Sequence, residues 1–200
     1  MKELFLILLV TFSYSLLCLY PIFTNNNFIL KKFNLTTQDL ITFNIFLLCN
    51  SLLILCLLNF KISHVVLITQ FFYVFLIILI FTVIKIDLTS KKFWSYFFFV
   101  FIGLIITIDI ANNLNLYWDA KKLWLPKTLV FFNDLDLSEL QNTNYPHYSF
   151  FGSIIWSYFW KLSHMEEEYF GRIFFGIIFC LSIFSFSKLF NNDLIKKNFI

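Results

Sequence analysis

The chain has 200 residues, of which 60% are hydrophobic and 14% are charged, and its 15 Lys and Arg against 12 Asp and Glu give a net charge of +3. A soluble domain carries about 25% charged residues and is about half apolar. The composition therefore excludes an ordinary soluble domain, and the small net charge gives no sign of nucleic-acid binding. Because the charges gather between long continuous apolar runs, the sequence predicts an all-α, polytopic membrane helix bundle rather than a barrel of short alternating strands.

A helix needs about 20 apolar residues to cross the hydrocarbon core of a bilayer. About six transmembrane helices are expected, at roughly 4–23, 40–60, 65–84, 93–110, 148–163 and 169–190. The first run is too long for a signal peptide and no small-residue cleavage site follows it, so a retained helix is expected. The fifth run is short and aromatic, and it would have to cross where the membrane is thin or begin in the interface.

The lysines orient these six spans. Alternate crossing places one group of lysines on the side of the 85–92 link, namely Lys31, Lys32, Lys85, Lys91, Lys92 and Lys161. The opposite side receives Lys2, Lys61, Lys121, Lys122, Lys127, Lys188, Lys196 and Lys197. Short loops decide orientation, so the 85–92 side is expected to be cytoplasmic and the long 111–147 loop periplasmic or external, although the C-terminal lysines oppose this. The surplus of Phe, Ile, Asn and Lys indicates a bacterial source, and hence the inner membrane.

Few other features of the apolar runs carry chemistry. The cysteines all fall inside these runs without a C-x-x-C pair, so they are expected to pack in the core: Cys18, Cys49, Cys56 and Cys180. No spacing of His, Cys and acidic residues suits a metal site, and neither a glycine-rich phosphate loop nor a nucleophile elbow is present. The scarcity of charge within the runs also disfavours a transporter.

Polar residues concentrate in the 111–147 loop, which holds four acids, three lysines and two of the five Trp. Its stretch YWDAKKLWLPK, 117–127, combines one acid, three lysines and both of these Trp. Asp119 is expected to cap or open a short helix, and Pro126 to kink or restart it. An amphipathic juxtamembrane helix with Trp anchors and long lysines would account for this segment without any active site.

A second cluster, NYPHYSFFGSIIW at 144–156, follows at the end of the loop. Pro146 is expected to hold Tyr145 extended and to mark the entry to the fifth helix. Tyr145, His147 and Tyr148 are aromatic residues with polar tips, which are typical of a membrane interface. An interface belt is therefore one interpretation of this cluster, and a set of substrate contacts is the other.

The order of these pieces is more specific than any one of them. A helix leads to W-D-A-x-x-x-W-x-x-K, then to about twenty polar residues, Y-P-x-Y, a short aromatic helix, a charged turn with E-E-x-x-x-R and another helix. This order resembles the N-terminal core of the GT-C membrane glycosyltransferases, most closely the bacterial dolichyl-phosphate-mannose-transferase-like and RgtA/B/C/D-like branch. The resemblance covers about 93–190. It leaves three helices in 1–92 as an N-terminal addition.

The resemblance implies transfer of a sugar from a polyprenyl-phosphate donor to an acceptor hydroxyl outside the cytoplasm. The lipid bilayer and the lipid-linked donor would be the partners, and no cofactor is implied. Asp119 matches the first-loop catalytic acid of the family and would act as the general base. Lys122 and Lys127 are the nearby cations for the leaving phosphate.

Further substrate contacts are implied at the loop exit and in the later charged turn. Tyr145 belongs to the Y-P exit and His147 follows it, while Arg172 matches an Arg of the family in that turn. The spacing of Arg172 also suits an ion pair with one of the three preceding Glu residues at a helix entry.

Two departures from the family pattern stand out. Many relatives have an Asp-Glu pair where this chain has Asp119 and Ala120, so a second acid would come from Asp109 or Asp134. The chain is also short for the family, and its 191–200 tail is expected to mark a truncated or split protein, whose C-terminal half or partner membrane protein is separate. A non-catalytic membrane scaffold or accessory subunit is the competing interpretation.

Overall fold

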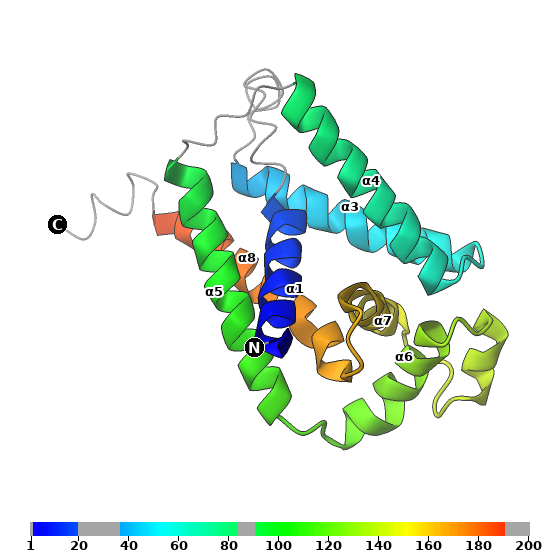
Figure 1. The fold of residues 1–200 in the computed structure, drawn as a ribbon. Coiled ribbons are helices and arrows are strands. Elements are labelled where there is room, and N and C mark those ends of the chain that lie inside the picture. The colour runs from blue at the N-terminus through cyan, green and yellow to red at the C-terminus, as the bar shows by residue number, and fades with distance from the viewer. Residues whose placement is uncertain (1, 20–36, 84–90, 191–200) are drawn as a thin grey trace.

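The computed structural model describes residues 2–19, 37–83 and 91–190, and all regular structure in these ranges is helical (Figure 1). This confirms the all-α prediction for the described residues. The helices of 18 or more residues, called the long helices below, are α1 (Lys2–Leu19), α3 (Thr37–Leu57), α4 (Ile62–Val83), α5 (Lys91–Asn113) and α8 (Ile173–Phe190). Their boundaries follow the apolar runs of the sequence closely.

The long helices alternate in direction along the chain (Figure 1). Contacts join α1 to α5, α5 to α8 and α3 to α4. The crossing of α5 and α8 is tight, because a Cβ atom added to Gly176 would lie 2.1 Å from Thr107 Oγ1. Small residues that allow helices to approach this closely are typical of helix contacts in membranes.

Residues 114–172, between α5 and α8, pack against one end of the long helices and are called the cap. The cap contains η2 (Ala120–Trp124), α6 (Leu125–Phe132), η3 (Leu137–Asn142), α7 (Phe151–Ser163) and η4 (Glu168–Arg172). Helices α6 and α7 lie side by side and run in the same direction. Ser153 Oγ donates to Trp124 O at 3.1 Å near their starts, and Lys161 Nζ donates to Phe132 O near their ends.

The segment expected as the fifth span forms a short helix. Helix α7 has 13 residues, about 20 Å of helix, whereas the hydrocarbon core is about 30 Å thick. It is viewed nearly along its axis in Figure 1, where α1 and α5 are viewed from the side, so it lies across the bundle. Lys161, near its end, contacts the last residue of α6, and Arg172 beyond it contacts the end of α5. Both flanks of α7 therefore lie at one end of the bundle.

Two stretches within the described residues are long and apolar enough to cross a membrane, Asp39–Leu57 and Trp94–Asn113. Leu4–Leu17 and Ile62–Phe75 are shorter apolar helices. The remaining spans expected from the sequence stay predictions.

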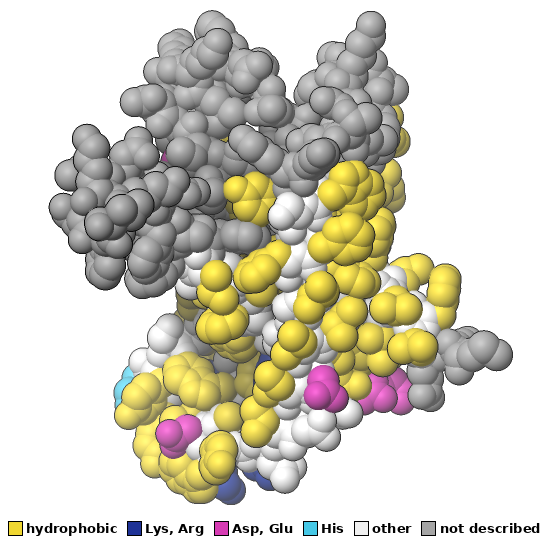
Figure 2. Space-filling view, turned by 90° about the vertical axis from the view of Figure 1, so that its left-hand side faces the viewer, with side chains coloured by type: hydrophobic (Ala, Val, Ile, Leu, Met, Phe, Trp, Pro, Cys, Tyr) yellow, Lys and Arg dark blue, Asp and Glu magenta, His cyan; other side chains and the backbone are white. Residues whose placement is uncertain are grey.

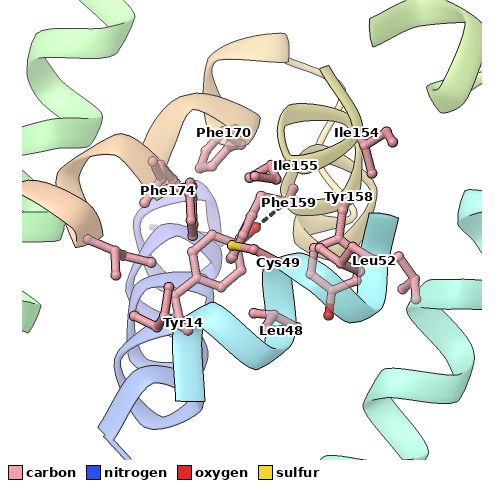
Figure 3. Packing of buried hydrophobic residues seen from close by; sticks show 14 of the residues in the cluster. Tyr14, Leu48, Cys49, Leu52, Ile154, Ile155, Tyr158, Phe159, Phe170 and Phe174 are labelled. Atoms are coloured by element: carbon pink, nitrogen blue, oxygen red, sulfur yellow. Dashed lines mark hydrogen bonds between the residues drawn. The ribbon is translucent and has the colours of Figure 1, made fainter. Parts of the chain in front are cut away.

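The apolar core lies where α7 meets α1, α3 and α8 (Figure 3). Tyr14 of α1 donates its hydroxyl hydrogen to Phe159 O of α7, and Phe159 stacks on Phe174 of α8 with ring centroids 4.9 Å apart. On the α4 side, the Tyr158 hydroxyl pairs with Thr69 Oγ1 at 2.8 Å. Aromatic packing and buried hydrogen bonds thus fix α7 crosswise beneath the long helices.

The cysteines with described side chains lie in the core as expected: Cys49, Cys56 and Cys180 are buried and unpaired. The side chain of Cys18 lies outside the described residues.

The outward faces of the long helices are apolar. On α4, Phe71 is 75% exposed and Phe72 and Phe75 are also exposed, and on α5 the exposed side chains include Phe98 and Ile102. Figure 2, which views the side where α5 lies in Figure 1, shows apolar side chains up the described surface and charged ones gathered at its lower end. Monomeric soluble proteins rarely expose contiguous apolar patches larger than a few hundred Å². This surface therefore requires a lipid or protein covering.

Candidate functional site

Asp119 lies at the start of the cap with its side chain exposed. Its backbone is already helical, at φ −59° and ψ −45°, and its carboxylate makes no capping hydrogen bond. Of the two roles expected from the sequence, Asp119 therefore does not cap the helix but lies in the turn that opens it. The helical backbone begins at Trp118, so Asp119 lies inside the first turn and not ahead of it. Its carboxylate remains open to a ligand.

The turn after Asp119 is a π-helical turn. Leu125 N–H donates to Ala120 O, five residues back. Pro126 has no N–H, and its ring crowds the carbonyl four residues before it, so a wider turn at this point relieves the clash. Helix α6 then begins with Pro126 in its first turn, and the helical backbone continues without a break from Trp118 through the π-helical turn into α6. Single π-turns of this kind are frequent at functional sites.

A pocket of about 370 Å³, called the cap pocket, opens beside this turn. Its walls include Ala120 and Trp124 from η2, Gly152 and Trp156 from α7, Arg172 from η4 and Phe175 from α8. Asp119 is the chain neighbour of Ala120. A mostly apolar and aromatic pocket of this size with one fixed cation has the composition of a small-molecule site.

Arg172 connects the cap pocket to the end of α5. Its guanidinium donates to Ala111 O at 3.0 Å, to Leu114 O at 3.5 Å and to Glu168 Oε1 at 2.8 Å. The ion pair allowed by the sequence spacing is thus formed with Glu168. Burial raises the pKa of the Glu168 carboxyl, and the neighbouring Arg172 charge only partly opposes this. Arg172 Nε is buried and has no partner among the described residues, so one donor of this cation is left unused beside the pocket.

Lys127 is not an exposed cation. Its side chain is 0% exposed, and its Nζ donates to Tyr145 O at 2.8 Å and to Tyr148 O at 2.7 Å. The same Nζ lies 6.0 Å from the ring centroids of Trp124 and Tyr148. Burial lowers the pKa of the Lys127 ammonium. Lys127 does not line the cap pocket, and its role in the structure is to hold the loop exit against α6.

The loop exit departs from the sequence prediction as well. Tyr145 has a φ of 54° and is not extended. Its carbonyl is turned inward to accept hydrogen bonds from Lys127 Nζ and from Tyr148 N–H at 3.1 Å, which explains the unusual backbone. His147 stacks on Tyr148 with centroids 5.0 Å apart. Tyr145 and His147 are exposed and do not line the cap pocket, so their position favours the interface-belt interpretation.

Lys122 is exposed on the same short segment as Asp119. Its backbone carbonyl accepts a hydrogen bond from Asn144 Nδ2 at 3.4 Å, which ties η2 to the loop exit. Lys121 and Lys122 are both exposed, and they are the two cations nearest to Asp119 along the chain.

The two candidates for a second acid differ in their surroundings. Asp134 accepts hydrogen bonds from Ser63 N–H at 2.9 Å, from the Ser63 hydroxyl and from Lys161 Nζ at 2.7 Å. Burial disfavours its charge, but these hydrogen bonds outweigh burial and lower the pKa of the Asp134 carboxyl. Asp134 thus connects the start of α4 to α7, and both of its carboxylate oxygens accept hydrogen bonds. Asp109 is exposed in the last turns of α5, where Asn113 Nδ2 lies 3.3 Å from its Oδ1.

Asp134→Asn is expected to lower the free energy of unfolding by about 1.5–3 kcal/mol at pH 7, the range for a hydrogen bond to a charged group. The lowered pKa means that the carboxylate stabilises the fold above the unfolded-state pKa of about 3.9, and that this stabilisation is lost as the pH falls through the folded-state pKa. The difference between wild type and variant should therefore shrink on acidification. Denaturant unfolding of the purified protein in detergent, in a series from pH 7 down to about pH 2, measures it. Asp136→Asn, at an exposed neighbouring acid, is the control, and a pH-independent difference would contradict the role given to Asp134.

Sequence reasoning did not find the contact among Ser63, Asp134 and Lys161, because nothing local pairs residues so far apart in the chain. No three His, Cys, Asp or Glu side chains gather as a metal site within residues 2–19, 37–83 and 91–190. Comparison with known proteins finds no matching family model, no matching curated protein and no matching solved structure. The functional assignment therefore depends on the geometry of the cap and on the order of its motifs.

Proposed function

We propose that the chain is an integral membrane glycosyltransferase, or a part of one, that transfers a sugar from a polyprenyl-phosphate donor to an acceptor hydroxyl outside the cytoplasm. One observation carries this proposal. Arg172 lines the cap pocket, and Asp119 directly precedes Ala120, which lines the same pocket from a distant part of the sequence; the resemblance assigns these two residues to substrate contact and to catalysis. The carboxylate is open, and the guanidinium is held rigidly by backbone carbonyls.

Five spans fit the chain better than six in this proposal, with α1, α3, α4, α5 and α8 crossing the membrane and the cap on the external side. The apolar outward faces of these helices support a bilayer surrounding, because they would be unfavourable in water. Without α7 as a span, α8 ends on the same side of the membrane as α4 does. The lysines that bear on this orientation, Lys85, Lys196 and Lys197, lie outside the described residues.

The orientation of α7 gives a direct prediction. In a cysteine-free background, Asn142→Cys in η3 and Glu166→Cys after α7 are both expected to react with a membrane-impermeant maleimide from the same side. Both native side chains are exposed, so labelling needs no change of fold. Labelling in intact cells and in inverted vesicles distinguishes the sides. Reaction of the two cysteines from opposite sides would show that α7 crosses the membrane and would overturn the five-span arrangement.

Sugar transfer requires one general base and one group that stabilises the leaving phosphate. The acceptor hydroxyl oxygen forms a bond to the anomeric carbon, the bond from that carbon to the phosphate oxygen breaks, and Asp119 accepts the hydroxyl proton. The departing polyprenyl phosphate keeps the electron pair, and its charge would be stabilised by Arg172 and by the exposed Lys122. Phe175 lines the pocket and is 53% exposed on α8, which supports a path for the lipid tail from the pocket to the bilayer.

Gly152 offers a test of donor binding. A Cβ atom at this position would meet nothing within 4 Å, so Gly152→Leu fills the cap pocket without disturbing the packing around it. Binding of radiolabelled polyprenyl phosphate to the purified protein in nanodiscs is expected to fall at least about tenfold, the equivalent of about 1.4 kcal/mol. Gly152→Ala, which adds only one methyl group, should bind as wild type does. Unchanged binding to Gly152→Leu would count against the cap pocket as the donor site.

A non-catalytic accessory subunit is the second candidate. It is favoured by the fact that Lys127, Asp134 and Arg172 all hold the cap together through hydrogen bonds, as they would in a rigid binding module. An accessory subunit needs no lipid-phosphate binding of its own, so the Gly152 experiment separates the two candidates.

A further inference from the structure

A second cavity, of about 440 Å³, lies between α1, α4 and the C-terminal end of α7. It is called the bundle cavity, and none of its lining residues lines the cap pocket. We propose that it binds one hydrocarbon chain of a neutral lipid whose head group carries hydroxyl groups, as in a monoacylglycerol. This proposal depends on the membrane placement of the long helices but not on the glycosyltransferase activity.

The walls of the bundle cavity suit a hydrocarbon chain. The apolar side chains that line it come from all three helices: Leu9, Val10, Leu16 and Leu17 of α1, Val74 of α4 and Leu162 of α7. Helix α1 packs on α3 and α5, whereas α4 packs on α3, α6 and α7, and the cavity occupies the space between α1 and α4. Within a bilayer, water has too few partners along such walls, so the space favours a lipid chain.

Polar groups meet at one place in this cavity, where α7 ends. The Tyr14 and Tyr158 hydroxyl groups are held there by Phe159 O and Thr69 Oγ1. Gln70 and His164 also line the cavity, and neither side chain hydrogen-bonds to any residue that the structure describes. An unused amide and an unused imidazole next to an apolar channel are complementary to the head and the chain of an amphiphile.

The charges at this end of the cavity select a neutral head group. Among the residues that the structure describes, no Lys, Arg, Asp or Glu lines the cavity, and the nearest charged side chain of α7, Lys161, is already paired with Asp134. The exposed Glu166 and Glu167 follow His164 closely in the chain and would repel an anionic head group. Hydroxyl and ester groups, by contrast, match both the amide of Gln70 and the ring of His164.

Native mass spectrometry of the purified chain with monooleoylglycerol tests this proposal. Wild type is expected to retain one lipid molecule, and Val74→Trp and Ser13→Trp, which add bulk from α4 and from α1, should each weaken binding at least about tenfold. Both native side chains are partly open, at the mouth of the cavity, so the larger rings do not require a change in the core. Phe71→Trp, on the outward face of α4, is the matched control and should bind as wild type does.

Two further measurements sharpen the test. Gln70→Leu should weaken monooleoylglycerol about two- to tenfold, the range for loss of one neutral hydrogen bond. An anionic phosphatidylglycerol should not compete at equal concentration. The proposal is overturned if Val74→Trp and Phe71→Trp bind equally, or if phosphatidylglycerol displaces monooleoylglycerol. Gly152→Leu changes only the cap pocket. If this variant still retains the neutral lipid, lipid binding in the bundle cavity is independent of donor binding in the cap pocket.

Discussion

Asp119→Asn is expected to lower the rate of sugar transfer from a polyprenyl-phosphate donor by about 10²–10⁴-fold, the usual contribution of a general base. The amide keeps the size of the side chain but cannot accept the acceptor proton. Since the carboxylate makes no capping hydrogen bond and is exposed, the substitution should leave the fold unchanged. Transfer of radiolabelled sugar in membranes that contain the chain measures the effect.

The matched control for this variant is Asp136→Asn, a second exposed acid of the cap. It should transfer sugar at the wild-type rate, and both variants should bind polyprenyl phosphate as wild type does. Near-normal transfer by Asp119→Asn would remove the general-base assignment. A loss of donor binding in that variant would show instead that Asp119 acts in binding.

Lys127→Met is expected to have the largest effect on stability, lowering the free energy of unfolding by about 2–5 kcal/mol. The substitution removes two hydrogen bonds from a charged donor, at 2.8 and 2.7 Å, and leaves the carbonyls of Tyr145 and Tyr148 without this partner. Removing the ammonium also removes the free-energy cost of taking this charge out of water, and this offsets part of the effect. Denaturant unfolding in detergent at pH 7 measures it.

Lys121→Met is the control for Lys127, since it removes an exposed lysine from the same segment. Its free energy of unfolding should stay within about 0.5 kcal/mol of wild type. Equal stability of the two variants would contradict the structural role of Lys127. That result would make Lys127 a candidate phosphate contact again.

The long helices could be predicted because their apolar runs are continuous and longer than the helices of most soluble domains. The expected 93–110 and 40–60 spans correspond to Lys91–Asn113 and Thr37–Leu57. The role of α7 could not be predicted in the same way. Local composition does not distinguish a helix that faces lipid from one that lies across a bundle. The polar residues of α7 are the feature that could have indicated its position. Ser153 and Lys161 donate hydrogen bonds to other parts of the cap, and Ser157 donates one to the backbone of α7.

The candidate site could be predicted only in part. Asp119 is recognisable because its motif is contiguous, and the sequence alone proposed Arg172 as a contact. Burial, however, depends on tertiary packing, so Lys127 and Asp134 could not be distinguished from exposed charges by their spacing. The left-handed backbone of Tyr145 depends likewise on a distant ammonium that draws its carbonyl inward.

The most direct test of donor binding in the cap pocket is site-specific photocrosslinking on α8. Benzoylphenylalanine in place of Phe175, which lines the pocket, is expected to crosslink a radiolabelled polyprenyl-phosphate sugar, and excess unlabelled polyprenyl phosphate should suppress the crosslink. The same residue in place of Phe179, exposed one turn further on and outside the pocket lining, should give no suppressible crosslink. Equal crosslinking at both positions, or none at Phe175 while the donor is bound, would contradict the assignment of the cap pocket as the donor site.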